Sequence, residues 1–257
     1  MSLAVAARVV EREARVFSKL WRGSVFSSFV TPVLYLGAMG LGLGGIVDAR
    51  NRSVAGLSYL AFVTPGLMAA GAMQSAAGES LWPVLSGFKW MRHYQAMSAA
   101  TPRPSDIYDG VVGWLGCHVA LTSAAFLAVA AALGGVESAW APLAVPAAVL
   151  GALAVAAPLA AFSATQDSDV AFSAIMRLAV IPLFLFSGTF FPVSLLPGWA
   201  QALVVLSPLW HAVELCRAAT TGSITAGSAL GHLAFLIACI AAGAFWGHRS
   251  FARRLTP

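Results

Sequence analysis

Apolar residues in this chain run in long blocks, which charged or Pro/Gly-rich breaks separate. We expect six spans, at about 24–46, 58–82, 107–133, 141–164, 171–192 and 227–248. Each block has the roughly 20 helical residues that cross a bilayer core about 30 Å thick, and none alternates with the period of a barrel strand. The pattern predicts an all-α polytopic membrane protein within a single transmembrane domain over residues 1–257.

The segment before the first span has a different pattern. Residues 4–22 place Val5, Val9 and Val16 at helical spacing, among five basic and two acidic side chains. A helix with one apolar face and one basic face lies in the membrane interface rather than across it. We therefore expect an interfacial amphipathic helix here.

Two connections depart from a simple helix–loop–helix pattern. Residues 83–106 mix aromatic and basic side chains and end in a Thr-Pro-Arg-Pro turn, which predicts a cytoplasmic loop with a short amphipathic helix. Residues 192–217 are apolar, but Pro192, Pro197 and Ser207-Pro208 divide them into pieces too short to cross. We expect a re-entrant pair of half-helices on the outer side, with Ser207 as N-cap of the second.

Composition agrees with a membrane location. Hydrophobic residues make up 59% of the 257 residues and charged residues 10%, with a mean hydropathy of +0.82, whereas soluble domains are about 25% charged. The net charge of +5 is spread in small groups beside the apolar blocks, which argues against nucleic acid as a partner. The three cysteines form no CxxC pair, so neither a disulfide framework nor a zinc site is indicated.

The basic residues also predict the orientation. With the N-terminus inside, twelve Lys and Arg residues lie on the cytoplasmic side and three, Arg50, Arg52 and Arg217, lie outside. The positive-inside rule therefore favours cytoplasmic N- and C-termini. An even number of crossings is consistent with that arrangement.

Few residues could carry chemistry. The only lysines, Lys19 and Lys89, are followed by Leu and Trp, so the chain has no P-loop and any ATP hydrolysis needs another chain. Glu79, His118, Arg177 and His232 fall within the spans; we interpret them as snorkelling or hydrogen-bonded groups. Ser187 and His232 are a nominal serine-protease pair without a nucleophile motif around the serine.

Three ionisable residues in the second half-helix repeat at a spacing of three, which places His211, Glu214 and Arg217 on one helical face. This face permits an ion pair that pins the re-entrant turn, or a contact with a substrate headgroup or gate. No further ligands suggest a metal site and no nucleophile suggests catalysis, so we expect neither a metal nor a catalytic residue.

Two regions resemble a known family. The first is the run from Pro83 to Met97 (PVLSGFKWMRHYQAM), continued from Ala100 to Gly110 (ATPRPSDIYDG); the second is SGTFFP at 187–192, LPGW at 196–199 and SPLWHAVELCR at 207–217. Both resemble the ABC-2 export permeases, and the chain is most similar to the branch of nodulation-factor exporters and its drug-export relatives. The resemblance covers nearly the whole chain, and the second region is the more specific.

The resemblance implies partners and a mechanism. Two such permeases, copies of one chain or paralogues, assemble with two ABC ATP-binding subunits in the bacterial plasma membrane, among membrane lipids. ATP and Mg are bound by the partner ATPase, and this chain binds no cofactor and is not an enzyme. A coupling helix, here about 86–98, would sit in a cleft of the ATPase, through the candidate contact residues Phe88, Lys89, Trp90, Arg92 and Tyr94. The same aromatic and basic residues also suit a helix lying on lipid headgroups.

The implied cargo is a drug, a lipid or a glycan-like amphipath. A mostly apolar pathway or gate would suit it, with candidate lining residues Met39, Met68, Met73, Gln74, Phe184 and Phe186, together with the outer cluster His211, Glu214 and Arg217. Each apolar residue could equally face lipid. The alternative function is an ion-coupled secondary transporter, but such a protein would need internal repeats and a central carboxylate, and we find neither.

Overall fold

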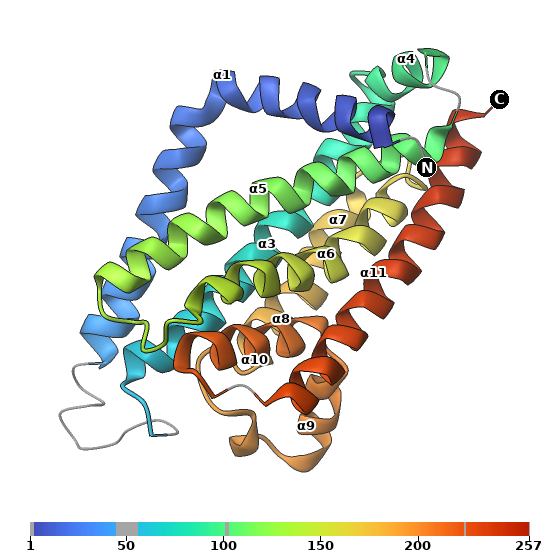
Figure 1. Cartoon of the computed structure of the whole chain (residues 1–257). Helices are drawn as coiled ribbons and strands as arrows, with labels where there is room; N and C mark the ends of the chain where they lie inside the picture. The colour runs from blue at the N-terminus through green and yellow to red at the C-terminus, as the bar shows by residue number, and fades with distance from the viewer. Residues whose placement is uncertain (1–2, 45–55, 101–102, 224, 257) are drawn as a thin grey trace.

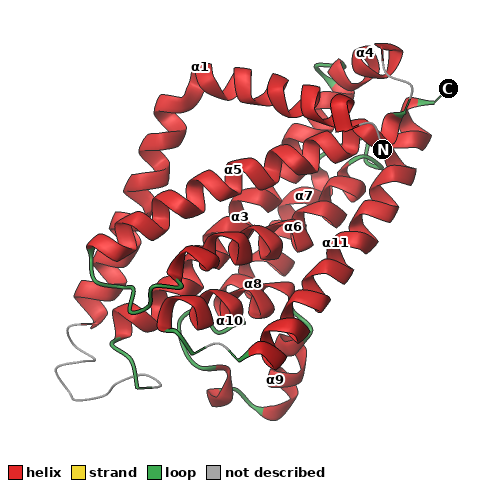
Figure 2. Ribbon diagram, viewed as in Figure 1, coloured by secondary structure: helices red, strands yellow, loops and turns green. Residues whose placement is uncertain are grey.

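The computed structural model describes residues 3–44, 56–100, 103–223 and 225–256. Within these ranges the chain is helical and contains no strand, as Figure 2 shows. The predicted class, an all-α polytopic membrane protein, is confirmed. Four described helices are long and apolar enough to cross a membrane, or up to five if one sharply bent pair counts as a single span.

Helix α1 (Leu3–Tyr35) is continuous with a π-helical segment, Leu36–Leu43. It is bent: its first part runs across the ends of the other helices and its later part runs alongside them (Figure 1). The crosswise part contains the basic segment 4–22, and the later part contains the predicted span 24–46, whose last two residues lie outside the described ranges. This arrangement is the one expected for an interfacial helix that leads into a span.

The next spans match their predicted positions with small extensions. Helix α3 (Tyr59–Lys89) is capped by Ser58 and continues seven residues beyond the predicted end at 82. A short helix α4 (His93–Ala100) follows, and then α5 (Pro104–Ala132), with Pro104 in the first turn. A 3₁₀ turn (Ala141–Leu143) leads into α6 (Ala144–Ser163).

The core is built around α6, which is rich in small residues. Nine alanines and Gly151 of this helix are buried, and α6 contacts α3, α5, α10 and α11. Without a hydrophobic driving force between helices in lipid, small residues stabilise packing because they let backbones approach closely. A Cβ on Gly151 would lie 2.2 Å from the Ala212 Cβ, so α10 can approach α6 only at a glycine.

The fifth predicted span, 171–192, is a run of α7 (Val170–Ile175), a π segment (Met176–Val180) and α8 (Ile181–Phe186). After a 3₁₀ turn (Val193–Leu195) come α9 (Gly198–Val205) and α10 (Pro208–Thr221), whose axes are bent by 84°. The last helix, α11 (Ala226–Leu255), extends past the predicted end at 248. The predicted pair of half-helices is thus present as α9 and α10.

The two ends of the bundle differ. Both chain termini and α4 lie at one end, together with the crosswise part of α1, whereas α9 and α10 lie at the other (Figure 1). This arrangement is consistent with termini on one side of a membrane.

Candidate functional site

The connection between α3 and α4 forms an exposed surface at the end that holds the termini. Lys89, Trp90, Met91 and Arg92 are exposed, Trp90 by 59% and Met91 by 72%. Arg92 has a φ of 50° and is the non-glycine residue with a positive φ in the described chain. We call residues 89–92 the α3–α4 corner. An exposed Trp and Met beside two cations form a surface that can dock into a groove of another protein.

This geometry corrects the predicted coupling helix. A single amphipathic helix over about 86–98 was expected, but α3 runs on to Lys89 and α4 begins at His93. The helix breaks at Arg92 because its left-handed backbone cannot continue an α-helix. No glycine or proline marks the break, so the sequence pattern gives no sign of it.

Two of the five candidate contact residues are buried within the chain. Phe88 is 2% exposed and Tyr94 3%, and their rings pack against each other and against Phe251 of α11, with centroids 4.8–5.7 Å apart. The guanidinium of Arg254 lies over the Phe88 ring, 4.8 Å from its centroid. Phe88 and Tyr94 therefore connect the α3–α4 corner to α3 and α11 instead of presenting a surface to a partner.

The corner is also tied to the loop between α6 and α7. Lys89 Nζ donates to the carbonyl of Asp167 at 2.7 Å, and Arg254 donates to the carbonyls of Ala164 and Gln166 at 2.7 and 2.5 Å. These hydrogen bonds connect α3, α11 and this loop at one end of the bundle. A displacement of the corner would be passed to the long helices.

The side chains of His211, Glu214 and Arg217 on α10 make contacts that connect elements at the opposite end of the bundle. Arg217 pairs with Glu214 at 2.6 Å and donates to the carbonyl of Gly188 at 2.6 Å, so it joins α10 to the turn after α8. Its guanidinium also lies over the Phe62 ring, 4.4 Å from the centroid. His211 is within hydrogen-bond distance of His232 Nδ1, at 2.8 Å, and of the Val205 carbonyl, at 3.0 Å.

Ser187 and His232 are not arranged as a nucleophile and its base. Ser187 Oγ lies 3.0 Å from Ser207 Oγ, and His232 pairs with His211. Ser207 is the N-cap residue of α10, as predicted, but its hydroxyl makes no capping bond and lies beside the Ser187 hydroxyl. These hydroxyls connect the end of α8 to the start of α10.

An apolar cavity of about 600 Å³ lies between the α7–α8 run and α9. Phe186, a candidate for the substrate pathway, lines it together with Leu178, Trp199 and Leu203, and Ser187 and Ser207 are polar groups in its wall. Such a cavity suits an apolar molecule or chain.

The other pathway candidates are less accessible. Met68 and Met73 are buried in the core at 2% and 0% exposure, so neither borders an open path in this conformation. Gln74 is half-buried, and Phe184 is half-buried against Phe190. The side chain of Met39 lies outside the described part of the structure.

Two pairs of a histidine and a carboxylate connect neighbouring helices, and the sequence did not predict either pair. His118 of α5 lies 2.8 Å from Glu79 of α3, and His248 of α11 lies 2.6 Å from Asp109 of α5. The interpretation of His118 as a hydrogen-bonded group agrees with this contact, but Glu79 was not identified as its partner. A Glu and a His at similar depth in neighbouring spans was the available signal, because a buried polar group in lipid needs a partner.

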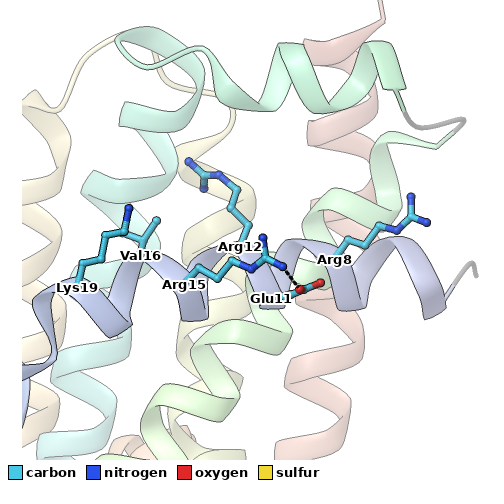
Figure 3. Close-up of a pocket in the computed structure, with 6 residues that line it drawn as sticks. All are labelled: Arg8, Glu11, Arg12, Arg15, Val16 and Lys19. Atoms are coloured by element: carbon cyan, nitrogen blue, oxygen red, sulfur yellow. Dashed lines mark hydrogen bonds and ion pairs between the residues drawn. The ribbon is translucent and has the colours of Figure 1, made fainter.

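The crosswise part of α1 carries a basic face. Arg8, Arg12, Arg15 and Lys19 recur every three or four residues and, with Glu11 and Val16, line a shallow pocket of about 240 Å³ (Figure 3). Glu11 pairs with Arg15 at 2.5 Å. Cations at this level of the bundle are suited to anionic lipid headgroups.

Among the described residues, no group of three or more His, Cys, Asp or Glu side chains is placed to hold a metal ion.

Comparison with known proteins agrees with these features. The family model described as "ABC-2 type transporter" matches residues 9–221. Nodulation protein J of Rhizobium meliloti (strain 1021) is 29% identical over 97% of this chain and 93% of its own length. Nodulation protein J of Rhizobium leguminosarum bv. trifolii is 32% identical over 81% of this chain and 78% of its own length. Nodulation protein J of Sinorhizobium fredii (strain NBRC 101917 / NGR234) is 30% identical over 86% of this chain and 83% of its own length.

The matched region contains the α3–α4 corner, the apolar cavity and α10. Permeases of this family are membrane subunits of ABC transporters and lack an ATPase domain of their own. The chain therefore belongs to the ABC-2 type transporter family, as a membrane subunit of an exporter.

Proposed function

We propose that this chain is the permease of an ATP-driven exporter and that two separate ABC ATP-binding subunits supply the hydrolysis. A second permease, either another copy of this chain or a paralogue, completes the transporter in the bacterial plasma membrane. ATP and Mg bind to the ATPase partners, and the permease undergoes the conformational change. The observation that carries this proposal is the exposed α3–α4 corner, which joins an apolar and basic surface directly to two long helices.

The corner contacts the ATPase through Lys89, Trp90 and Arg92. Phe88 and Tyr94 act behind them, because these rings hold α3, α4 and α11 together. Gly87 supports that packing, since a Cβ there would lie 2.3 Å from the Tyr94 ring. When two ATPases close on ATP, they move the corner, and the movement reaches the spans through this aromatic cluster. Nucleotide can shift the equilibrium between two conformations of the permease only if it favours one of them over the other. The energy of ATP binding therefore reaches the permease at its contact with the ATPase.

The proposed cargo is an amphipathic molecule such as a drug, a lipid or a lipid-linked glycan. The apolar cavity beside Phe186 supports this class, because its wall is apolar except for two hydroxyls. The outer network of His211, Glu214 and Arg217 holds the re-entrant pair in place and gates the path at that end, with Gln74 and Phe184 farther along it.

Six membrane crossings complete the proposal: α1 with its π segment, α3, α5, α6, the α7–α8 run and α11. The α9–α10 pair then enters and leaves the membrane from the outer side. Both termini and the α3–α4 corner are cytoplasmic. The basic residues of the crosswise part of α1 and of the end of α11 support this orientation.

The coupling contact is tested with the double variant Trp90→Ala and Arg92→Gly. Glycine is chosen at 92 because it adopts the positive φ without strain, so the helix break is retained while the guanidinium is removed. Loss of an aromatic anchor from an interface costs about 2 kcal/mol, roughly thirty-fold in affinity. We expect ATP hydrolysis stimulated by the permease to fall, with unchanged membrane insertion and elution as a monodisperse species.

The matched control is Trp140→Ala, since Trp140 is 63% exposed in the connection between α5 and α6, at the opposite end of the bundle. This control should retain the stimulated hydrolysis. Full stimulation in the double variant would contradict the assignment of the corner to the ATPase contact.

A further inference from the structure

A second cavity lies at the end of the bundle that holds the termini, between the crosswise part of α1 and helices α3, α4 and α5. Its volume is about 300 Å³. Its wall includes Glu13 and Phe17 of α1, Glu79 of α3, His93 of α4, and Trp114 and His118 of α5. The mechanism proposed above uses none of these side chains.

Three ring nitrogens of residues in the cavity wall have no hydrogen-bond partner among the described residues. His118 Nδ1 lies 2.8 and 3.0 Å from the two oxygens of Glu79, but His118 Nε2 is buried and meets no hydrogen-bond partner in the described structure. Both ring nitrogens of His93 are also buried without one. Buried polar atoms are normally satisfied by protein, water or ligand, so three unsatisfied nitrogens around one cavity point to an occupant.

Most of the unpaired ring nitrogens are hydrogen-bond acceptors, so an occupant should supply hydrogen-bond donors. His118 Nδ1 lies against the Glu79 carboxylate, so Nε2 is the ring nitrogen that remains for an occupant. A neutral His93 ring presents one further acceptor. Burial, reinforced by the nearby charge of Arg12, lowers the pKa of His93 to about 4, so this ring is neutral at pH 7. With the carboxylates, the wall is rich in acceptors.

The charge of the wall has one sign. Its charged residues are Glu13 and Glu79, and no Lys or Arg contributes to it. Arg12 pairs with Glu13, which reduces the charge on that side. Among the described side chains, Glu79 pairs with the His118 ring and the Ser75 hydroxyl, at 2.8 and 3.3 Å. The uncompensated negative charge is therefore centred on Glu79.

Aromatic rings form the rest of the wall. Trp114 and His118 are parallel, with their ring centroids 5.9 Å apart, and Phe17 meets both edge-on, at 5.8 and 5.2 Å. Tyr94 borders the same cavity. Aromatic faces attract cations and also bury the flat apolar body of an amphipathic molecule.

We propose that this cavity is a binding site for an amphipathic primary or secondary amine in its ammonium form. An ammonium group brings several N–H donors to the acceptors of Glu79, His93 and His118, and its charge meets that of Glu79. An anion would be repelled by the carboxylates, and a neutral acceptor would leave the imidazole lone pairs unsatisfied. Binding requires no nucleotide and no second subunit, so this inference is independent of the proposed ATPase partner.

The site is tested by direct binding to the full-length permease in lipid nanodiscs. The probe is dansylcadaverine, an aromatic primary amine, followed by fluorescence anisotropy, and the comparator is N-pentyl dansylamide, which has the same fluorophore and chain length without the ammonium. We expect saturable binding of the amine and binding of the comparator weaker by roughly ten-fold or more. Equal affinity for the two probes would overturn the proposal.

The position is tested with Glu79→Gln, which removes the charge and nearly retains the volume. The matched control is Glu137→Gln, the same change in an exposed loop beyond the far end of α5. We expect the amine to bind roughly ten-fold more weakly to the first variant and normally to the second. Unchanged affinity in Glu79→Gln would show that the amine binds elsewhere.

A second variant keeps the test decisive if Glu79→Gln does not fold. His93→Phe removes two of the unsatisfied nitrogens from α4, where the ring is only half-buried. It should weaken the amine at least several-fold while leaving the elution profile unchanged. Wild-type affinity in a folded His93→Phe protein would equally contradict the site.

Discussion

At the scale of single residues, the absence of a side chain determines how closely the helices approach. A Cβ on Gly66 of α3 would lie 2.7 Å from the Thr189 Cα, in the turn after α8. Gly71, five residues along the same helix, has no neighbour within 4 Å of the equivalent position. The sequence shows both glycines in the same apolar block and cannot distinguish them, because the difference depends on a segment more than a hundred residues away.

Alanine at these two glycines should have opposite effects on stability. Gly66→Ala forces α3 away from the backbone of Thr189 and should lower the melting temperature in detergent. Gly71→Ala meets no neighbour and gains helix propensity of up to about 1 kcal/mol, so its melting temperature should stay the same or rise. The measurement is a thermal unfolding curve by intrinsic fluorescence. Equal destabilisation by both would contradict the close α3 contact.

At the scale of elements, the sequence predicts regular helices better than their interruptions. The spans could be predicted because an apolar block of sufficient length indicates a membrane helix. The start of α10 could be predicted because Pro208 favours the first position of a helix and Ser207 favours the N-cap. The end of α3 could not be predicted, because Arg92 has a positive φ, which arginine does not favour. The burial of Phe88 and Tyr94 was also not predicted, because both rings are covered by Phe251, which lies near the other end of the chain.

The candidate sites follow the same distinction. The spacing of Glu214 and Arg217 correctly predicts their ion pair, since both lie on one helix. The partner of His211 could not be predicted, because His232 lies on another helix, α11. Met68 and Met73 show that an apolar residue in a span does not by itself indicate a pathway, since both are packed in the core.

Arg217 joins three elements, so its removal should cost more than neutralising its partner. Arg217→Ala leaves Glu214 unpaired and the Gly188 carbonyl without its donor; loss of one partner of a buried pair costs about 3–5 kcal/mol, and half-burial of Glu214 reduces this figure. Glu214→Gln retains a hydrogen-bond acceptor for Arg217 and should cost less. Thermal unfolding of both variants measures the difference. A larger loss in Glu214→Gln would show that Arg217 does not hold the turn after α8.

At the scale of the whole molecule, the helices form a bundle with two chemically different ends. One end has the termini, the basic face of α1 and the α3–α4 corner; the other has the α9–α10 pair and its ion-pair network. An exporter requires such a difference, because energy enters at one face and cargo leaves at the other. The six crossings of the proposal assign the first end to the cytoplasm.

Thiol labelling tests this orientation in spheroplasts. In a background where Cys117, Cys216 and Cys239 are replaced by alanine, single cysteines are placed at exposed Glu137 and Thr256. An impermeant maleimide should label Glu137→Cys in intact spheroplasts and Thr256→Cys only after permeabilisation. Labelling of both from the same side would contradict an orientation with Thr256 inside and Glu137 outside.

The central claim is that a separate ABC ATPase drives this permease. The most direct measurement is to isolate the tagged chain from its native membrane in mild detergent, after brief cross-linking, and to identify its partners by mass spectrometry. The account predicts an ABC ATP-binding subunit in a ratio of one per permease, and its loss when Trp90→Ala and Arg92→Gly are combined. Recovery of the permease without any ATPase, with transport that instead follows an ion gradient, would contradict it.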